Sequence, residues 1–93
     1  MNRTLQSQNT NKIETASHQG YNITFTTTSK IDGIESITTN ATKDGMYAFN
    51  ITERLTPNAN TSISFNTAFD MDIVQDVLAE FTKIKAEAEP EQD

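Results

Sequence analysis

Polar and apolar residues alternate along four stretches in the middle of the chain, at 21–28, 36–41, 47–55 and 62–66. A period of two places every second side chain on the same face of a β-strand. The apolar positions are mainly aromatic and β-branched residues, which strands favour. The pattern therefore predicts four strands, each with one face toward a core and the other toward solvent.

Aspartate–glycine pairs at Asp32-Gly33 and Asp44-Gly45 separate the first three stretches and indicate hairpins. A two-residue loop at either pair would place the apolar residues of neighbouring strands on opposite faces of the sheet. A three-residue loop that ends in glycine and is closed by a bulge keeps them on one face, so we predict this loop at both sites. The expected cross-strand partners are Phe25 with Thr39, Ile23 with Ala41, Ile37 with Ile51, and Thr39 with Phe49.

The stretch 69–85 has the period of a helix, because its apolar positions recur every three or four residues and charges lie between them. Asp70 and Asp72 fall in the first turn, and Lys83 and Lys85 fall in the last, as the helix dipole favours. The sequence thus predicts an α+β domain over 21–86, a four-stranded antiparallel β-meander followed by one C-terminal amphipathic α-helix packed on its apolar face. The predicted core contains Phe25, Phe49, Ile51, Ile63 and Phe65 of the sheet and Val77 and Phe81 of the helix. Tyr21 and Tyr47 are expected on the same apolar face.

The two ends of the chain lack such patterns. Residues 1–20 are mostly Gln, Asn, Thr and Ser, which predicts a disordered polar arm, with a short extra strand around Ile13 as the alternative. Residues 87–93 are predicted to form a disordered acidic tail, which supplies four of the six net negative charges. The rest of the chain is therefore close to neutral.

The composition narrows the classes of function. The chain has no cysteine, and its single histidine, His18, lies in the polar arm. A nucleophile and its base need a scaffold that fixes both, so we predict no catalytic residues, no cofactor, no metal site and no enzymatic activity. No apolar run is long enough for a signal-peptide core or a membrane span, which predicts a cytoplasmic protein without membrane contacts.

Three carboxylates, Asp72, Asp76 and Glu80, are spaced by four and share one face of the predicted helix. A cation site or a contact for a basic partner would use such a face. No glycine-bearing calcium loop accompanies them, so a solvated face is the favoured interpretation.

The polar positions of the strands form the least ordinary feature, because they are rich in hydroxyl and amide groups where exposed strands usually carry charges. Threonine favours strands, so its presence on a solvent-exposed face needs no functional explanation. The more specific interpretation is that this face binds a partner. Four strands and a helix are also similar in outline to transcription-coactivator and Whirly-type single-strand binders, although none of their motifs is present. The candidate face contains Thr24, Thr26, Thr28, Thr38, Asn40, Asn50, Thr52, Arg54, Ser62 and Ser64.

The apolar arc of the helix spans roughly 140°, wider than the ~100° stripe that one sheet covers. The surplus flank contains Met71, Val74 and Leu78 and predicts a homodimer, since a small domain gains stability from a partner. We therefore expect a small non-catalytic interaction or regulatory module that acts through protein–protein contacts, with an unknown protein partner. The alternative is a single-stranded nucleic-acid binder that uses the polar face, which the acidic charge disfavours.

Overall fold

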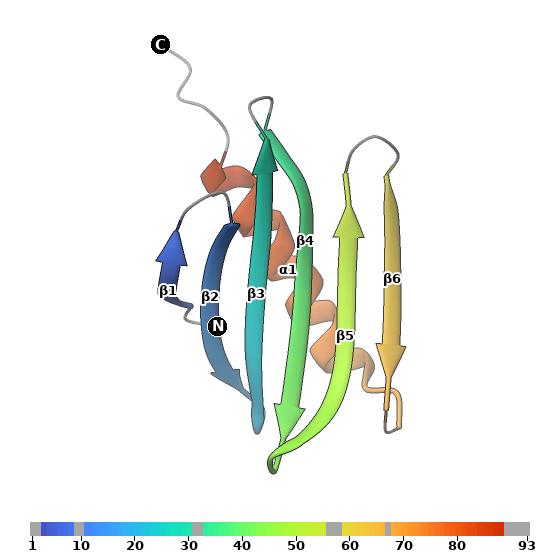
Figure 1. Cartoon of the computed structure of the whole chain (residues 1–93). Helices are drawn as coiled ribbons and strands as arrows, with labels where there is room; N and C mark the ends of the chain where they lie inside the picture. Colours follow the sequence, from blue (N-terminus) through green and yellow to red (C-terminus); the bar gives the residue numbers. More distant parts are fainter. Residues whose placement is uncertain (1–2, 9–10, 31–32, 56–58, 67, 89–93) are drawn as a thin grey trace.

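The computed structural model describes residues 3–8, 11–30, 33–55, 59–66 and 68–88. Within these ranges the strands form one antiparallel sheet in chain order, and a single helix crosses one of its faces (Figure 1). We call the face under the helix the inner face and the opposite one the outer face. The elements are β1 (Thr4–Gln8), β2 (Asn11–His18), β3 (Tyr21–Lys30), β4 (Gly33–Lys43), β5 (Met46–Arg54), β6 (Asn60–Phe65) and α1 (Met71–Ala88).

The predicted α+β class and the helix-on-sheet arrangement are confirmed, but the predicted strand count is wrong. Among the described residues the sheet has six strands, because β1 and β2 form from the segment that we expected to be a disordered arm. Strand β2 contains Ile13, so the alternative of an extra strand around this residue is the one that the structure shows. Strand β2 pairs with β3 along its whole length, and its buried residues are Glu14 and Ala16. Neither residue marks an apolar face in the sequence, which is why the alternation does not identify this strand. Of the predicted tail, Glu87 and Ala88 belong to α1, and residues 89–93 lie outside the described residues.

The predicted pairing of β3 with β4 is confirmed, with Phe25 opposite Thr39 and Ile23 opposite Ala41. The predicted three-residue loop is wrong there, because Gly33 pairs with Lys30 and the extra residue is Glu35, a bulge between the pairs Ser29–Ile34 and Thr28–Ser36. The predicted pairing of β4 with β5 is wrong by two residues, because Thr39 lies opposite Ile51 and Ala41 opposite Phe49. Each pair of apolar faces nevertheless stays together, since a shift of two preserves the side-chain face.

The turns explain the difference in register. Lys43 pairs with Met46, so the loop between β4 and β5 has two residues, Asp44 and Gly45, and both have positive φ, 56° and 79°. A two-residue loop of this kind is the usual hairpin turn. The parity that it would disturb is restored by a bulge at Ala48, the extra residue between the pairs Thr42–Tyr47 and Ala41–Phe49.

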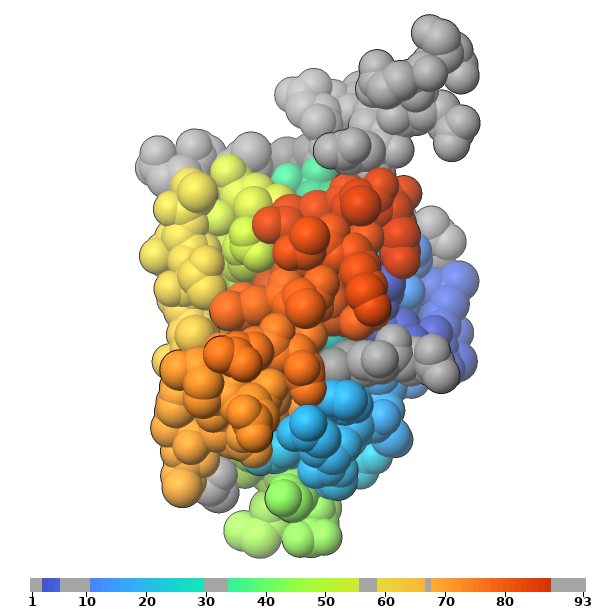
Figure 2. All heavy atoms as spheres, turned by 180° about the vertical axis from the view of Figure 1, so that it is seen from behind, coloured from blue at the N-terminus to red at the C-terminus, as the bar shows by residue number. Residues whose placement is uncertain are grey.

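The core lies between the inner face and α1. Phe25, Phe49, Ile51, Val77 and Phe81 are buried there as predicted, and the rings of Phe25 and Phe81 meet edge to face at 6.2 Å. The prediction for β6 is wrong in part: Phe65 is only half-buried and Ile63 is 41 % exposed. The helix does not extend over the edge strand, so β6 stays visible beside α1 (Figure 2).

Candidate interaction surfaces

The outer face carries cross-strand rows of hydroxyl and amide side chains. The strand registers place all ten residues of the predicted binding face on it. One row crosses all six strands, and a second row beside it ends at Tyr47. The first row is Thr4, Thr15, Thr24, Asn40, Asn50 and Ser64, and the second is Ser17, Asn22, Thr42 and Tyr47.

The bulge at Ala48 changes the face on which Tyr47 lies. We expected Tyr47 on the apolar face together with Tyr21, but the structure buries Tyr21 and leaves Tyr47 44 % exposed. Tyr47 lies opposite Thr42, an outer-face residue, so its ring belongs to the polar side of the sheet. The alternation alone could not show this, because a bulge shifts the pattern by one residue at a position that the pattern does not mark.

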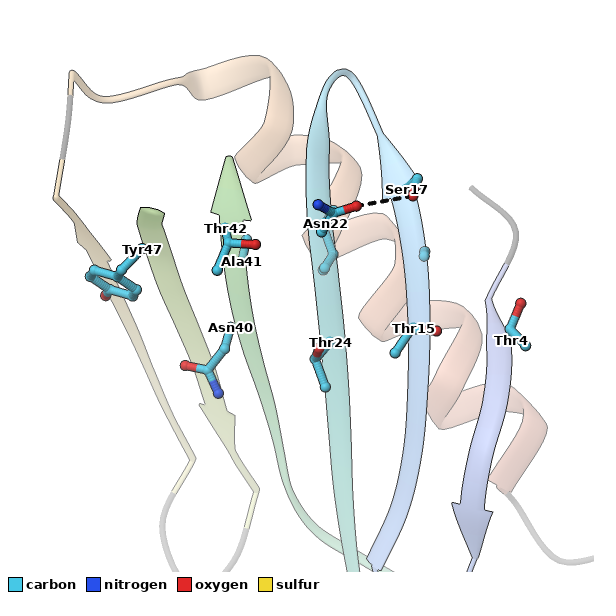
Figure 3. Close-up of a pocket in the computed structure, with 11 residues that line it drawn as sticks. Thr4, Thr15, Ser17, Asn22, Thr24, Asn40, Ala41, Thr42 and Tyr47 are labelled. Atoms are coloured by element: carbon cyan, nitrogen blue, oxygen red, sulfur yellow. Dashed lines mark hydrogen bonds between the residues drawn. The ribbon is translucent and has the colours of Figure 1, made fainter. Parts of the chain in front are cut away.

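A shallow hollow of about 370 Å³ lies between these two neighbouring rows. Figure 3 shows side chains of Ser17, Asn22, Thr24, Asn40, Thr42 and Tyr47 around it, on the side of the sheet away from the helix. No charged residue lines the hollow.

Hydrogen bonds fix the amide groups of this region. The Asn50 amide nitrogen donates to Asn40 Oδ1 at 2.7 Å, and the Thr52 hydroxyl donates to Asn50 Oδ1 at 3.2 Å. The Ser17 hydroxyl donates to Asn22 Oδ1 at 3.3 Å. Asn22 and Asn40 therefore use their oxygens within the protein and retain their nitrogens as donors for other groups.

A second surface lies on the inner side of the sheet, beside the uncovered strand β6. We call it the apolar strip, and its members lie on the inner face of β6, before the helix or on its first two turns. Phe65 connects the strip to the core, because its ring stacks on Phe49 at 5.0 Å and meets Phe69 at 5.1 Å. The strip consists of Ile63, Phe65, Phe69, Met71 and Leu78.

The structure divides the predicted dimer residues. Met71 is exposed and Leu78 is half-buried against the core, so both belong to the apolar strip. Val74 is fully part of the monomer core. The surplus of apolar surface on this flank of the helix is therefore narrower than the sequence suggests.

Arg3, the residue directly before β1, forms a clasp with glutamates of β2 and α1. Its guanidinium contacts Glu80 at 2.6 Å, Glu87 at 2.6 Å and Glu14 at 2.8 Å, and its side chain is only 7 % exposed. Burial alone would lower the pKa of Arg3, but the hydrogen bonds to the three glutamates outweigh it and raise that pKa above its ordinary value. The residue is thus a permanent cation at the junction of sheet and helix.

The carboxylates on the helix face have separate partners. Glu80 belongs to the clasp, and Asp76 Oδ2 lies 2.7 Å from His18 Nε2 and accepts a hydrogen bond from Gln19. Asp72 is exposed. Among the described residues, no three acidic or histidine side chains lie close enough together to hold a metal ion.

Asp70 links the start of the helix to the sheet. Its Oδ1 accepts a hydrogen bond from the Ile73 backbone nitrogen at 3.3 Å, which caps the helix, and its Oδ2 accepts one from the Tyr21 hydroxyl at 3.1 Å. Burial of Tyr21, together with the hydrogen bond and the charge of Asp70, raises the pKa of the Tyr21 phenol.

Comparison with known proteins adds no assignment. No protein-family model, curated protein or solved structure matches the chain significantly. In the part of the chain that the structure describes, no helix has the length and apolar character that crossing a membrane requires.

Proposed function

We propose that the protein is a small non-catalytic interaction module that works through protein–protein contacts as a homodimer. The observation that supports this most directly is the apolar strip beside β6. A protein of this size gains stability when a second copy covers such a surface.

The edge of β6 suits pairing with a second copy. The strand lies at one end of the sheet, and its sequence, NTSISF, contains neither proline nor charge. Edge strands that avoid pairing usually carry such residues. The adjacent charges on the inner side, Glu53 and Lys85, neutralise each other at 2.9 Å. Electrostatic repulsion between two copies is therefore small at this edge.

A twofold axis perpendicular to the sheet provides a simple geometry. It pairs β6 with β6 of the second copy in antiparallel orientation and leaves both helices on the same face. The two apolar strips then face each other between the helices. Backbone hydrogen bonds and apolar burial would stabilise the same interface.

Light scattering across a range of protein concentrations tests the dimer. We expect about twice the chain mass at micromolar concentration, and Leu78→Glu or Ile63→Glu should weaken dimerisation at least about tenfold, because a buried charge at an interface centre is costly. Thr26→Glu, on the outer face, is the matched control and should leave the mass unchanged. Phe81→Glu should unfold the chain, since Phe81 lies in the monomer core. A mass near one chain at all concentrations would exclude the dimer.

Single-stranded nucleic-acid binding by the outer face has less support. The exposed Tyr47 could stack on a base, and Arg54 lies on the same face. However, Arg54 lies three cross-strand rows from Tyr47, and neither lysine nor arginine lines the hollow. Backbone binding normally needs a basic stripe, so the neutral hollow favours an uncharged ligand.

A further inference from the structure

The bulge at Ala48 changes the environment of the aromatic side chain of Tyr47. Without it, the alternation of β5 would turn Tyr47 toward the inner face with Phe49 and Ile51. The bulge leaves Tyr47 on the outer face, at the end of a row of small polar side chains. Bulges commonly re-aim a side chain beside a functional site. Tyr47 thus provides an exposed ring next to the hollow (Figure 3).

The amide groups in the hollow are oriented for recognition. Asn22 and Asn40 lie on neighbouring strands at diagonal positions, which places their Cα atoms roughly 7–8 Å apart. Each uses its side-chain oxygen in a hydrogen bond within the protein. In Figure 3 the Asn22 nitrogen points away from Ser17. The two amides therefore direct their nitrogens away from their oxygen partners and can donate to a ligand in the hollow.

We propose that this hollow binds a neutral saccharide. A sugar ring offers many hydroxyl groups that can both accept from the two amides and pair with the hydroxyls of Thr24 and Thr42. Its less polar C–H face can lie against the Tyr47 ring. The volume of about 370 Å³ falls at the lower end of the ~300–1,000 Å³ range of small-molecule sites. The hollow thus suits a short saccharide.

The absence of charged side chains from the lining argues against phosphate-bearing and cationic ligands. The lining contains no lysine or arginine to attract a phosphate and no carboxylate to attract a cationic ligand. The apolar strip for the proposed dimer lies on the other side of the sheet, so this inference does not depend on dimerisation.

Amide chemical shifts of the chain of residues 1–93, measured by NMR during titration, test the proposal. The probes are maltotriose, cellotriose and chitotriose, with decathymidylate as the nucleic-acid comparison. At least one trisaccharide should give saturable shifts at Asn22, Asn40 and Tyr47, with a Kd on the order of 1 mM, as a small open site allows.

Variants locate the binding site. Tyr47→Ala should weaken saccharide binding about tenfold, whereas Tyr47→Phe retains the ring and should bind nearly as the parent does. Asn40→Ala should also weaken binding, and Ser62→Ala, on the same face but outside the hollow, should have no effect. The proposal is wrong if none of the three saccharides gives saturable shifts at the hollow. It is also wrong if decathymidylate binds there more tightly, with an affinity that falls steeply with salt.

Discussion

Replacing Arg3 by alanine should destabilise the fold more than the same substitution at any other polar residue of the N-terminal segment. The substitution removes the cation of the clasp and leaves the carboxylates of Glu14 and Glu80 in place. These residues are only 6 % and 3 % exposed, so both charges would stay buried without their main partner. The change also releases β1 from the helix, because Glu80 and Glu87 belong to α1.

The expected cost follows from burial. Removing one partner of a buried ion pair typically costs about 3–5 kcal/mol, because the other charge stays uncompensated. Lys12 at 3.9 Å from Glu14 and Lys83 at 3.8 Å from Glu80 remain as weaker partners, which favours the lower end of that range. We therefore expect a loss of about 3 kcal/mol. A domain of this length has a total stability of roughly 5–14 kcal/mol, so the loss is a large fraction of it.

Urea denaturation of a small set of variants separates charge from packing. Arg3→Ala should lower the unfolding midpoint strongly, and adding Glu14→Gln and Glu80→Gln should restore much of the loss, since neutral amides are cheaper to bury. Lys12→Ala is the control for a partly exposed cation and should cost less than about 1 kcal/mol. If Arg3→Ala costs as little as Lys12→Ala, or if the two glutamines recover nothing, the clasp does not stabilise the fold through buried charge.

Two further predictions concern polar groups in the core. Thr39 is fully buried, and its hydroxyl has no hydrogen-bond partner among the described residues, so the nearly isosteric Thr39→Val should stabilise the protein by about 1–2 kcal/mol; a lower urea midpoint would show that the hydroxyl is satisfied. The pKa of Tyr21 is raised from its ordinary value of 10.0, so its contribution to stability is present below that pH and is lost as the pH rises through the folded-state pKa. The thermal midpoint of the parent should therefore fall more steeply above about pH 10 than that of Tyr21→Phe, and parallel curves would contradict this account.

The two-residue alternation predicted β3 to β6, and the three-to-four-residue period predicted the helix, because each of these elements places apolar side chains on one face at regular intervals. Burial did not follow in β6, where Ile63 is 41 % exposed. Strand β2 does not follow this rule. Its inner positions include Glu14, whose burial depends on Arg3, and His18, which contacts Asp76 on the helix. These partners are distant in the sequence, so the pattern of a single strand could not reveal them.

The strand register shows a second limit of prediction from the sequence. Because side chains alternate between the two faces of a strand, the sequence correctly predicted that each hairpin contains one residue more than a two-residue loop allows. A three-residue loop and a two-residue loop followed by a bulge keep the apolar side chains on one face equally well. The structure has the bulge in both hairpins, at Glu35 in β4 and at Ala48 in β5. Only packing decides where the extra residue falls. The same ambiguity concealed the outward position of Tyr47.

The candidate surfaces differ in how far the sequence could predict them. The outer face follows directly from the alternation, so all ten of its predicted residues lie on it. The hollow depends on Ser17 of β2, which the sequence indicated only as an alternative short strand around Ile13, and on the bulge that exposes Tyr47. The apolar strip depends on how far the helix reaches across the sheet, which is why Val74 lies in the core while Met71 remains exposed.

The two proposed surfaces have a geometrical consequence for each other. A twofold axis perpendicular to the sheet leaves the outer faces of both copies on the same side of the dimer. The row that contains Asn40 runs to Ser64 on β6, so pairing at β6 would continue this row into the second copy. The dimer would then present two hollows on one extended polar face. A saccharide long enough to reach both hollows would bind with an avidity above that of either site, whereas a trisaccharide would not distinguish dimer from monomer.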